Sequence, residues 1–153
     1  MKKLLLIPAL AILFASCSKN DTTSDPSTDL TIKTNMVVQS DWTITQYTDS
    51  GKNETSDYSG YKFKFNSDGT FVAVSAVATF NGTWVLALGS SKQDDSYSYS
   101  DDDNLNKLTI SITGNKQMDH LSHKWLADKI TGTEIWLRDD NAASNEVLRF
   151  GKQ

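Results

Sequence analysis

The sequence predicts an all-β domain, a small antiparallel meander of about eight strands that closes into a barrel or a half-closed barrel. From Gln39 onwards, short stretches of alternating apolar and polar residues are separated by turn residues, and this period of two is typical of half-buried strands. No apolar stripe with the 3.6-residue period of a helix extends over a useful length. The chain has 153 residues, which fits one domain, and eight strands are enough to close a small barrel.

The first sixteen residues have the pattern of a secretory signal peptide. Two lysines near the N-terminus precede an apolar stretch over residues 4–14, and the small residues Ala15 and Ser16 follow it. The apolar stretch is shorter than the roughly 20 residues that a membrane-spanning helix needs. We therefore expect residues 1–16 to be removed on export, and we leave them out of the fold.

Cys17 is the only cysteine of the chain and directly follows this leader. The run from Phe14 to Cys17 resembles the bacterial lipobox, whose cysteine receives a diacylglyceryl thioether and becomes the mature N-terminus. Phe14 stands where leucine is usual. The alternative is an unmodified thiol in a chain whose leader is cut elsewhere. We expect acyl chains such as palmitate on Cys17 to anchor the protein, because each buried methylene contributes about 0.8 kcal/mol of membrane binding.

Residues 17–37 are expected to form a lipidated, flexible tether. The segment from Ser18 to Asn35 is rich in Ser, Thr, Asp and Asn, and it contains one proline and few apolar residues. Such a segment cannot bury enough apolar surface to offset the entropy lost on ordering. We therefore place the barrel domain at residues 38–153.

The strands can be placed in order along this domain. Residues 61–65 give the clearest pattern, with three aromatic residues on one face and two lysines on the other. A hairpin turn follows at Asn66–Gly69, because Gly69 adopts a positive φ without steric cost. The remaining predictions are strands at Trp42–Tyr47, from Phe71, and at Leu108–Ile112, Trp125–Ile130, Thr133–Leu137 and Glu146–Phe150, a turn at Thr131–Gly132, and one helical turn within Asn115–Lys124.

Two positions compete for the turn that follows the strand from Phe71. Asn81-Gly82 could be a two-residue hairpin turn between residues 71–80 and 83–88. Alternatively, the turn falls at Ser75–Ala78, and Gly82 lies inside a strand as a bulge or a point of close approach. The residue pattern alone favours the first alternative.

Several segments are similar, in order and spacing, to the lipocalin-like lipoproteins of Gram-negative bacteria. They are Asp41–Ile44, Tyr58–Thr70, Gly82–Trp84 and Glu134–Arg138. The resemblance covers roughly Val38 to Lys152 and implies a lipocalin-like antiparallel barrel, or a half-closed one, behind a lipoprotein leader. It favours the turn at Ser75–Ala78. The molecular function of this family is mostly unassigned.

Lipocalins proper begin with a Gly-x-Trp motif, whose tryptophan closes one end of the barrel under an arginine from a late strand. Trp42 is present here, but Ser40 stands at the glycine position. The resemblance makes Arg138 and Arg149, the two arginines of the chain, candidates to lie over Trp42. The missing glycine leaves a flattened or solidly packed barrel as an alternative to a full ligand cup.

The mature chain is acidic. Loss of Lys2 and Lys3 with the leader lowers the number of basic residues from 15 to 13 against 19 acidic ones, which gives a net charge of −6. An acidic domain does not attract nucleic acid or anionic lipid surfaces, so we expect no nucleic-acid partner. In similar lipoproteins an aspartate after the cysteine often retains the protein in the inner membrane. Ser18 at that position favours the outer membrane, on either its periplasmic or its outer face.

Six aromatic side chains are candidates to line a ligand pocket. An eight-stranded barrel either holds one small molecule or fills with side chains, and a domain of this size uses most of its aromatic residues as core. Packing is therefore favoured over a pocket at these positions. The candidates are Trp42, Tyr61, Phe63, Phe65, Phe71 and Trp84.

No metal-binding motif is convincing. The acidic loop at residues 94–104 suggests calcium, but an EF-hand that begins at Asp102 lacks the required glycine and glutamate. His120 and His123 are spaced to meet on a helical turn, but no cysteine is available to complete a zinc site. We expect a solvated loop, solvated histidines and no metal or other cofactor.

Two function classes remain. One is a membrane-anchored lipoprotein whose barrel binds a small apolar molecule or lipid. The other is an interaction module, such as an inhibitor or an accessory subunit of an envelope complex, with a solid core and an exposed patch that includes Trp125 or Trp136. Catalytic motifs such as Gly-x-Ser-x-Gly, His-Glu-x-x-His and glycine-rich phosphate loops are absent from the sequence, so we expect no enzyme.

Overall fold

The computed structural model describes residues 25–89, 106–141 and 143–153. The predicted signal peptide, Cys17, the first part of the expected tether and the acidic loop at 94–104 lie outside these ranges. The strands within them are β1 (Asp41–Asp49), β2 (Lys52–Asn53), β3 (Lys62–Phe65), β4 (Thr70–Val74), β5 (Thr79–Ala87), β6 (Asn106–Ile112), β7 (Lys124–Ile130), β8 (Glu134–Asp139) and β9 (Val147–Lys152), and the helices are α1 (Pro26–Val38), the 3₁₀ helix η1 (Thr55–Tyr58) and α2 (Lys116–Asp119).

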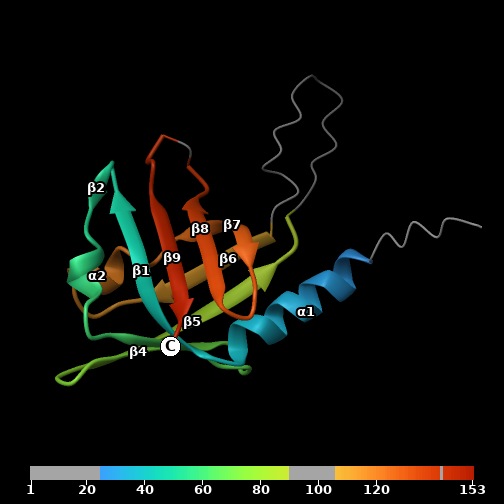
Figure 1. The fold of residues 1–153 in the computed structure, drawn as a ribbon, viewed down its shortest axis with the longest axis horizontal. Coiled ribbons are helices and arrows are strands. Elements are labelled where there is room, and N and C mark those ends of the chain that lie inside the picture. The colour runs from blue at the N-terminus through green and yellow to red at the C-terminus, as the bar shows by residue number, and fades with distance from the viewer. Residues whose placement is uncertain (1–24, 90–105, 142) are drawn as a thin grey trace, which may run out of the picture.

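Eight of these strands form a closed antiparallel barrel. Each of β3 to β8 pairs with the next strand along the chain, β1 pairs with β3, and β9 pairs back with β1 from Trp42↔Lys152 to Thr48↔Val147. Figure 1 shows β1 and β9 side by side where the wall closes. The short β2 pairs only with the end of β1 and lies outside the barrel. The predicted all-β meander of about eight strands is confirmed.

The strands alternate between the barrel interior and its outer surface, as their sequence pattern predicts. In β3, Phe63 and Phe65 are buried whereas Lys62 and Lys64 are exposed. The interior holds apolar side chains from every strand of the barrel, joined by Tyr58, Met118 and Leu121 from the segments between strands. This continuous core replaces the disulfide that a chain with a single cysteine cannot form.

The turn between β4 and β5 lies at Ser75–Ala78, where the amide of Ser75 donates a 2.8 Å hydrogen bond to the carbonyl of Ala78. The alternative turn at Asn81-Gly82 is therefore wrong. Gly82 lies inside β5 between Phe71 and Ile112. A Cβ atom at this position would lie 2.2 Å from the carbonyl oxygen of Ser111, so the close approach of β6 requires glycine. The hairpin turn before β4 is confirmed, with Gly69 at a φ of 84°.

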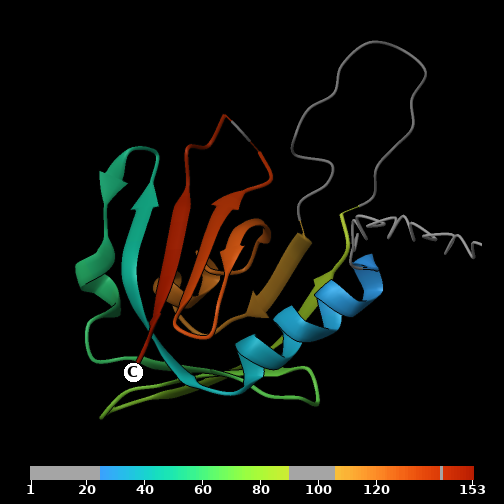
Figure 2. The ribbon, with the colours of Figure 1, turned by 45° about the vertical axis from the view of Figure 1, so that its right-hand side comes forward.

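Helix α1 corrects the expectation of a flexible tether over residues 26–37. Asp25 caps its N-terminus by accepting a 2.9 Å hydrogen bond from the amide of Ser27, and Pro26 occupies the first turn. The helix lies against the end of the barrel where β1 starts (Figures 1 and 2) and contacts β3, β5 and β7. Its ordering entropy is offset by tertiary contacts of Val37, which is fully buried, rather than by a regular apolar stripe.

The predicted helical turn between β6 and β7 is also present. The side chain of Asn115 caps α2 by accepting a 3.0 Å hydrogen bond from the amide of Met118, whose own side chain is buried. Across the ranges that the structure describes, every helix is too short or too polar to cross a bilayer.

Candidate functional site

The aromatic residues predicted to line a pocket are packed against one another. Trp42, Phe63, Phe65 and Phe71 have no exposed surface, and Trp84 is 8% exposed. The centroid of the Phe65 ring lies 4.6 Å from that of Phe71 and 5.3 Å from that of Trp84. A side chain with no accessible surface adjoins no void wide enough for a water molecule. These rings therefore pack against one another in this part of the barrel.

Phe150 and Tyr61 complete this aromatic cluster. Phe150 on β9 contacts both Phe63 and Phe65 edge-on, each at 5.6 Å between ring centroids. Tyr61, at the start of the predicted strand, is half-buried and lies between Phe63 and Phe80, at 6.1 and 6.3 Å. Edge-on and offset arrangements of this kind stabilise aromatic pairs beyond the area they bury.

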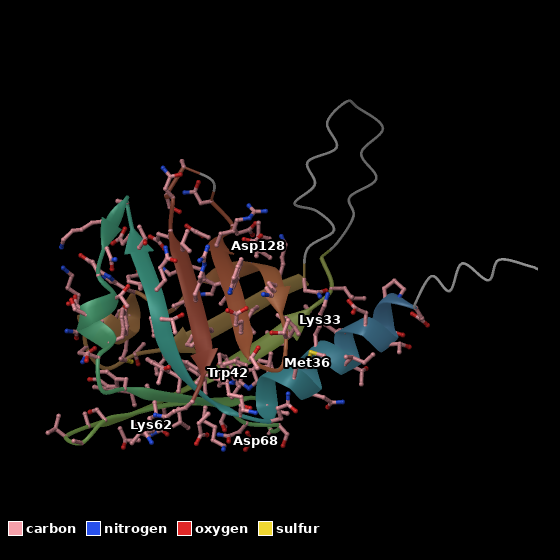
Figure 3. The ribbon with its side chains drawn as sticks, in the orientation of Figure 1. Lys33, Met36, Trp42, Lys62, Asp68 and Asp128 are labelled. Atoms are coloured by element: carbon pink, nitrogen blue, oxygen red, sulfur yellow. The ribbon has the colours of Figure 1, made fainter. Side chains whose placement is uncertain are left out.

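Trp42 is held by α1 rather than by an arginine. Its indole N–H donates a 2.8 Å hydrogen bond to the carbonyl of Val37, one of the last four carbonyls of the helix that have no partner within it. Figure 3 places Trp42 close to Met36, beside the last turn of α1. The C-terminal turn of α1 therefore covers this end of the barrel, which we call the base.

Arg138 and Arg149 correct the expectation that a late-strand arginine lies over Trp42. Both alternate along their strands with the inward-facing Leu137 and Leu148, so both face outward. Arg138 Nε donates a 2.9 Å hydrogen bond to a carboxylate oxygen of Asp128. The guanidinium of Arg149 lies 4.3 Å from the centroid of the outward-facing Trp136 ring, and Lys129 Nζ lies 4.5 Å from the same ring. Cation–π contacts therefore hold Arg149 and Lys129 on the outer wall.

Two clusters of titratable residues lie at the opposite end of the barrel, which we call the rim. It lies where β1 and β8 end and where β7 and β9 begin. Two groups of one histidine and two carboxylates lie here, and within each group the nearest ligand atoms all lie within 4.8 Å of one another. The His120 cluster consists of Asp49, Glu54 and His120, and the His123 cluster consists of His123, Asp139 and Glu146.

The His120 cluster is partly neutralised by a lysine. His120 Nδ1 lies 4.0 Å from Asp49 Oδ2 and 3.9 Å from Glu54 Oε2. The other oxygen of Glu54 accepts a 2.7 Å hydrogen bond from Lys52 Nζ. Below the cluster, burial and the neighbouring carboxylates raise the pKa of Tyr47, whose ring contacts Tyr58 edge-on at 5.2 Å.

In the His123 cluster the glutamate is more deeply buried than the glutamate of the His120 cluster. His123 Nε2 lies 3.8 Å from Glu146 Oε2, and the Glu146 side chain is 13% exposed. That oxygen is itself buried and has no hydrogen-bond partner among the described residues. Burial raises the pKa of the Glu146 carboxyl, whereas the nearby His123 lowers it. Asp139 is fixed beside Glu146, because its amide donates a 3.1 Å hydrogen bond to the Glu146 carbonyl.

The two histidines lie in separate clusters, not in a shared site on a helical turn, and both are half-buried rather than free in solvent. The spacing of the two histidines in the sequence did not indicate the two carboxylates that lie beside each of them. Asp49 and Glu146 are far apart along the chain and come together only because β9 pairs with β1. The other sequence-predicted metal candidate, the acidic loop, lies outside the described residues, as does Cys17.

Comparisons with known proteins add a fold likeness only. No protein-family model and no curated protein sequence matches this chain. Among solved structures, a DUF4847 family protein from Bacteroides vulgatus ATCC 8482 is similar, with 13% identity and a TM-score of 0.47, over 76% of this chain and 96% of that one. This likeness is too weak to carry an argument about function. The closed barrel itself, defined by its strand pairing, is compatible with a lipocalin-like ligand-binding domain.

Proposed function

We propose that this chain is a lipoprotein of the cell envelope, anchored in the outer membrane through lipid on Cys17, whose barrel is an interaction module with a solid core. The anchor is supported by the lipobox-like run from Phe14 to Cys17. The solid core is supported by one observation, the complete burial of Trp42, Phe63, Phe65 and Phe71.

A small apolar ligand would have to displace part of this core. Truncation of a buried phenylalanine typically costs about 3–5 kcal/mol, and a ligand that expels Phe63 or Phe71 must offset a penalty of that order. Side-chain packing therefore favours the interaction module. The carrier of a small apolar molecule remains the second candidate, because eight-stranded barrels with this closure can hold one ligand.

The outer face of β7 to β9 is the surface we propose for the partner, an envelope protein. Trp125, one of the two tryptophans considered for such a patch, is fully buried and plays no part in it. Trp136 faces outward, in register with Lys129 on β7 and Arg149 on β9. Tryptophan and arginine are enriched among the residues that dominate protein interfaces, and Arg149 Nε is a buried donor without a hydrogen-bond partner among the described residues.

Native mass spectrometry separates the two candidates. The chain should be exported as residues 18–153 behind a cleavable leader, because a version that starts beyond Asp25 would cut into α1. We expect a clean mass and no uptake from a total lipid extract. A reproducible added mass that exchanges with a fatty acid or phospholipid would instead establish the carrier.

The anchor and the partner face need their own tests. Cys17→Ala should abolish palmitate labelling and release the protein from the membrane fraction, and labelling that survives would contradict the anchor. A photo-crosslinking residue at position 136 should give a discrete product in intact cells. The matched control is position 111, which is exposed on β6. Equal products from both positions would contradict a specific partner face.

A further inference from the structure

We propose that the rim of the barrel binds a zinc ion, with His123, Asp139 and Glu146 as its protein ligands. This proposal depends on neither the lipid anchor nor the partner face. It rests on the chemistry of the three side chains, on their separation, and on the state of one buried carboxylate oxygen.

The donor set favours zinc over calcium. Zinc is bound by imidazole nitrogen and carboxylate oxygen, commonly through three protein ligands with a fourth position left for water or substrate. Calcium takes six to eight oxygen ligands, and the imidazole of His123 cannot supply one. The soft-to-intermediate character of a nitrogen donor selects zinc and neighbouring transition metals.

The geometry needs only small side-chain rotations. Two ligand atoms bound to tetrahedral zinc at about 2.0–2.2 Å lie roughly 3.3–3.6 Å apart. His123 Nε2 and Glu146 Oε2 are separated by 3.8 Å, and the nearest ligand atoms of all three residues lie within 4.8 Å. Zinc can therefore bind without movement of β7, β8 and β9, since His123 directly precedes β7, Asp139 ends β8 and Glu146 directly precedes β9.

Glu146 Oε2 supplies the observation that points to a cation. It is a buried acceptor that faces His123 and has no hydrogen-bond partner among the described residues. A buried acceptor left in this state typically costs about 1–3 kcal/mol. A bound cation would satisfy this oxygen, and it would also lower the repulsion between Glu146 and the carboxylates of Asp139 and Asp49.

Neighbouring groups hold two of the ligands in place. The carboxylate of Asp139 accepts hydrogen bonds from the hydroxyl of Ser144 and, at 3.2 Å, from the amide of Asn141. The ring of His123 packs edge-on against Trp125, at 5.4 Å between centroids. Contacts of this kind orient metal ligands, and their loss typically weakens metal binding roughly 10–100-fold.

The His120 cluster provides an internal comparison. It has the same residue types, but Lys52 already binds one oxygen of Glu54, so a cation there must compete with an ion pair. We expect the first zinc equivalent to bind at the His123 cluster. His120→Ala is therefore the matched control for His123→Ala, because both remove an imidazole from the same rim.

The test is calorimetric titration of zinc acetate into the full chain, purified in detergent and treated with a chelator. We expect one tight equivalent that is unchanged by His120→Ala. Glu146→Gln and His123→Ala each remove a ligand, so each should weaken binding by at least the roughly 10–100-fold that loss of an outer-shell partner costs. The result that overturns the proposal is no saturable zinc binding by the unmodified chain, or equal affinity in all three variants.

A measurement without substitutions covers the case in which a variant does not fold. In the unmodified chain labelled with ¹⁵N-histidine, substoichiometric zinc should shift the imidazole resonances of one histidine before those of the other. A nuclear Overhauser effect to the Trp125 ring assigns the resonances of His123, because the two ring centroids lie 5.4 Å apart. Shifts confined to His120, or no shift at either ring, would contradict the assignment of the site to His123.

Discussion

The indole N–H of Trp42 donates a 2.8 Å hydrogen bond to the carbonyl of Val37, and this bond joins α1 to the first strand of the barrel. Both residues are fully buried. Each group supplies the hydrogen-bond partner that the other lacks. The carbonyl has no partner in the helix, and the indole would otherwise be an unpaired buried donor.

Trp42→Phe should destabilise the fold. The substitution keeps an aromatic ring but leaves the Val37 carbonyl without its partner, at a cost of about 1–3 kcal/mol. Urea unfolding of the mature chain measures it. Trp136→Phe is the control on the outer wall, and a loss at Trp42 no larger than at Trp136 would contradict the role of this bond.

Removal of α1 should have a larger effect than removal of a flexible tether. A chain that starts at Gln39 lacks the buried Val37, and burial of one such side chain contributes about 1.5–3 kcal/mol. We expect a lower urea midpoint than for a chain that starts at Ser18. Identical midpoints would restore the tether interpretation of residues 26–37.

Gly82→Ala should destabilise the barrel although alanine is small. The new Cβ would lie 2.2 Å from the carbonyl oxygen of Ser111, so β5 and β6 must separate, at a cost of roughly 1–3 kcal/mol. Gly132→Ala is the control, because its nearest neighbour is the flexible end of Gln39 at 3.1 Å. Thermal unfolding of the two variants compares them, and similar melting temperatures would contradict the argument.

Asp68 should make the hairpin before β4 dependent on pH. Its carboxylate accepts hydrogen bonds from the hydroxyl and amide of Thr70, and the side-chain bond first, then the backbone bond, lowers its pKa below 3.8. A lowered folded pKa gives stability that is present above about pH 4 and is lost as the pH falls through the folded value.

Asp68→Asn should therefore be less stable than the unmodified chain at pH 7, and the difference should shrink in acid. Chemical unfolding from pH 7 down to pH 2 measures the difference. A gap that stays constant or widens below pH 4 would show that the charge of Asp68 contributes nothing through Thr70.

The barrel wall was predictable because strand alternation is a local pattern. Successive side chains of a strand point to opposite faces of the sheet. The alternation of Lys62, Phe63 and Phe65 in the sequence therefore predicts that the phenylalanines face inward and the lysine outward. The position of the β4–β5 turn was not fixed by pattern, since Asn81-Gly82 has good turn residues. Gly82 is required instead by close contact with β6. Residues near Gly82 in the sequence do not reveal this contact.

Helix α1 and the rim clusters depend on contacts that are distant in sequence. Asp25 and Pro26 form a recognisable N-terminal signal for a helix, but the helix is held by Val37 and Trp42 rather than by its own composition. The rim unites Glu54 and His120 because η1 and α2 flank the same end of the barrel. Histidines could be noticed in the sequence, whereas the carboxylates they face could not be selected from 19 acidic residues.

The attachment of α1 also determines how the domain would respond to mechanical tension. If Cys17 is anchored in a bilayer as proposed, a pull on the barrel enters the described domain through Pro26 and passes along the helix to β1. That strand is held by β3 on one edge and β9 on the other, whereas the helix is held, within the part of the chain that the structure describes, by side-chain packing and the Trp42–Val37 bond. The helix should peel away at low force and lengthen the linkage while the barrel stays closed.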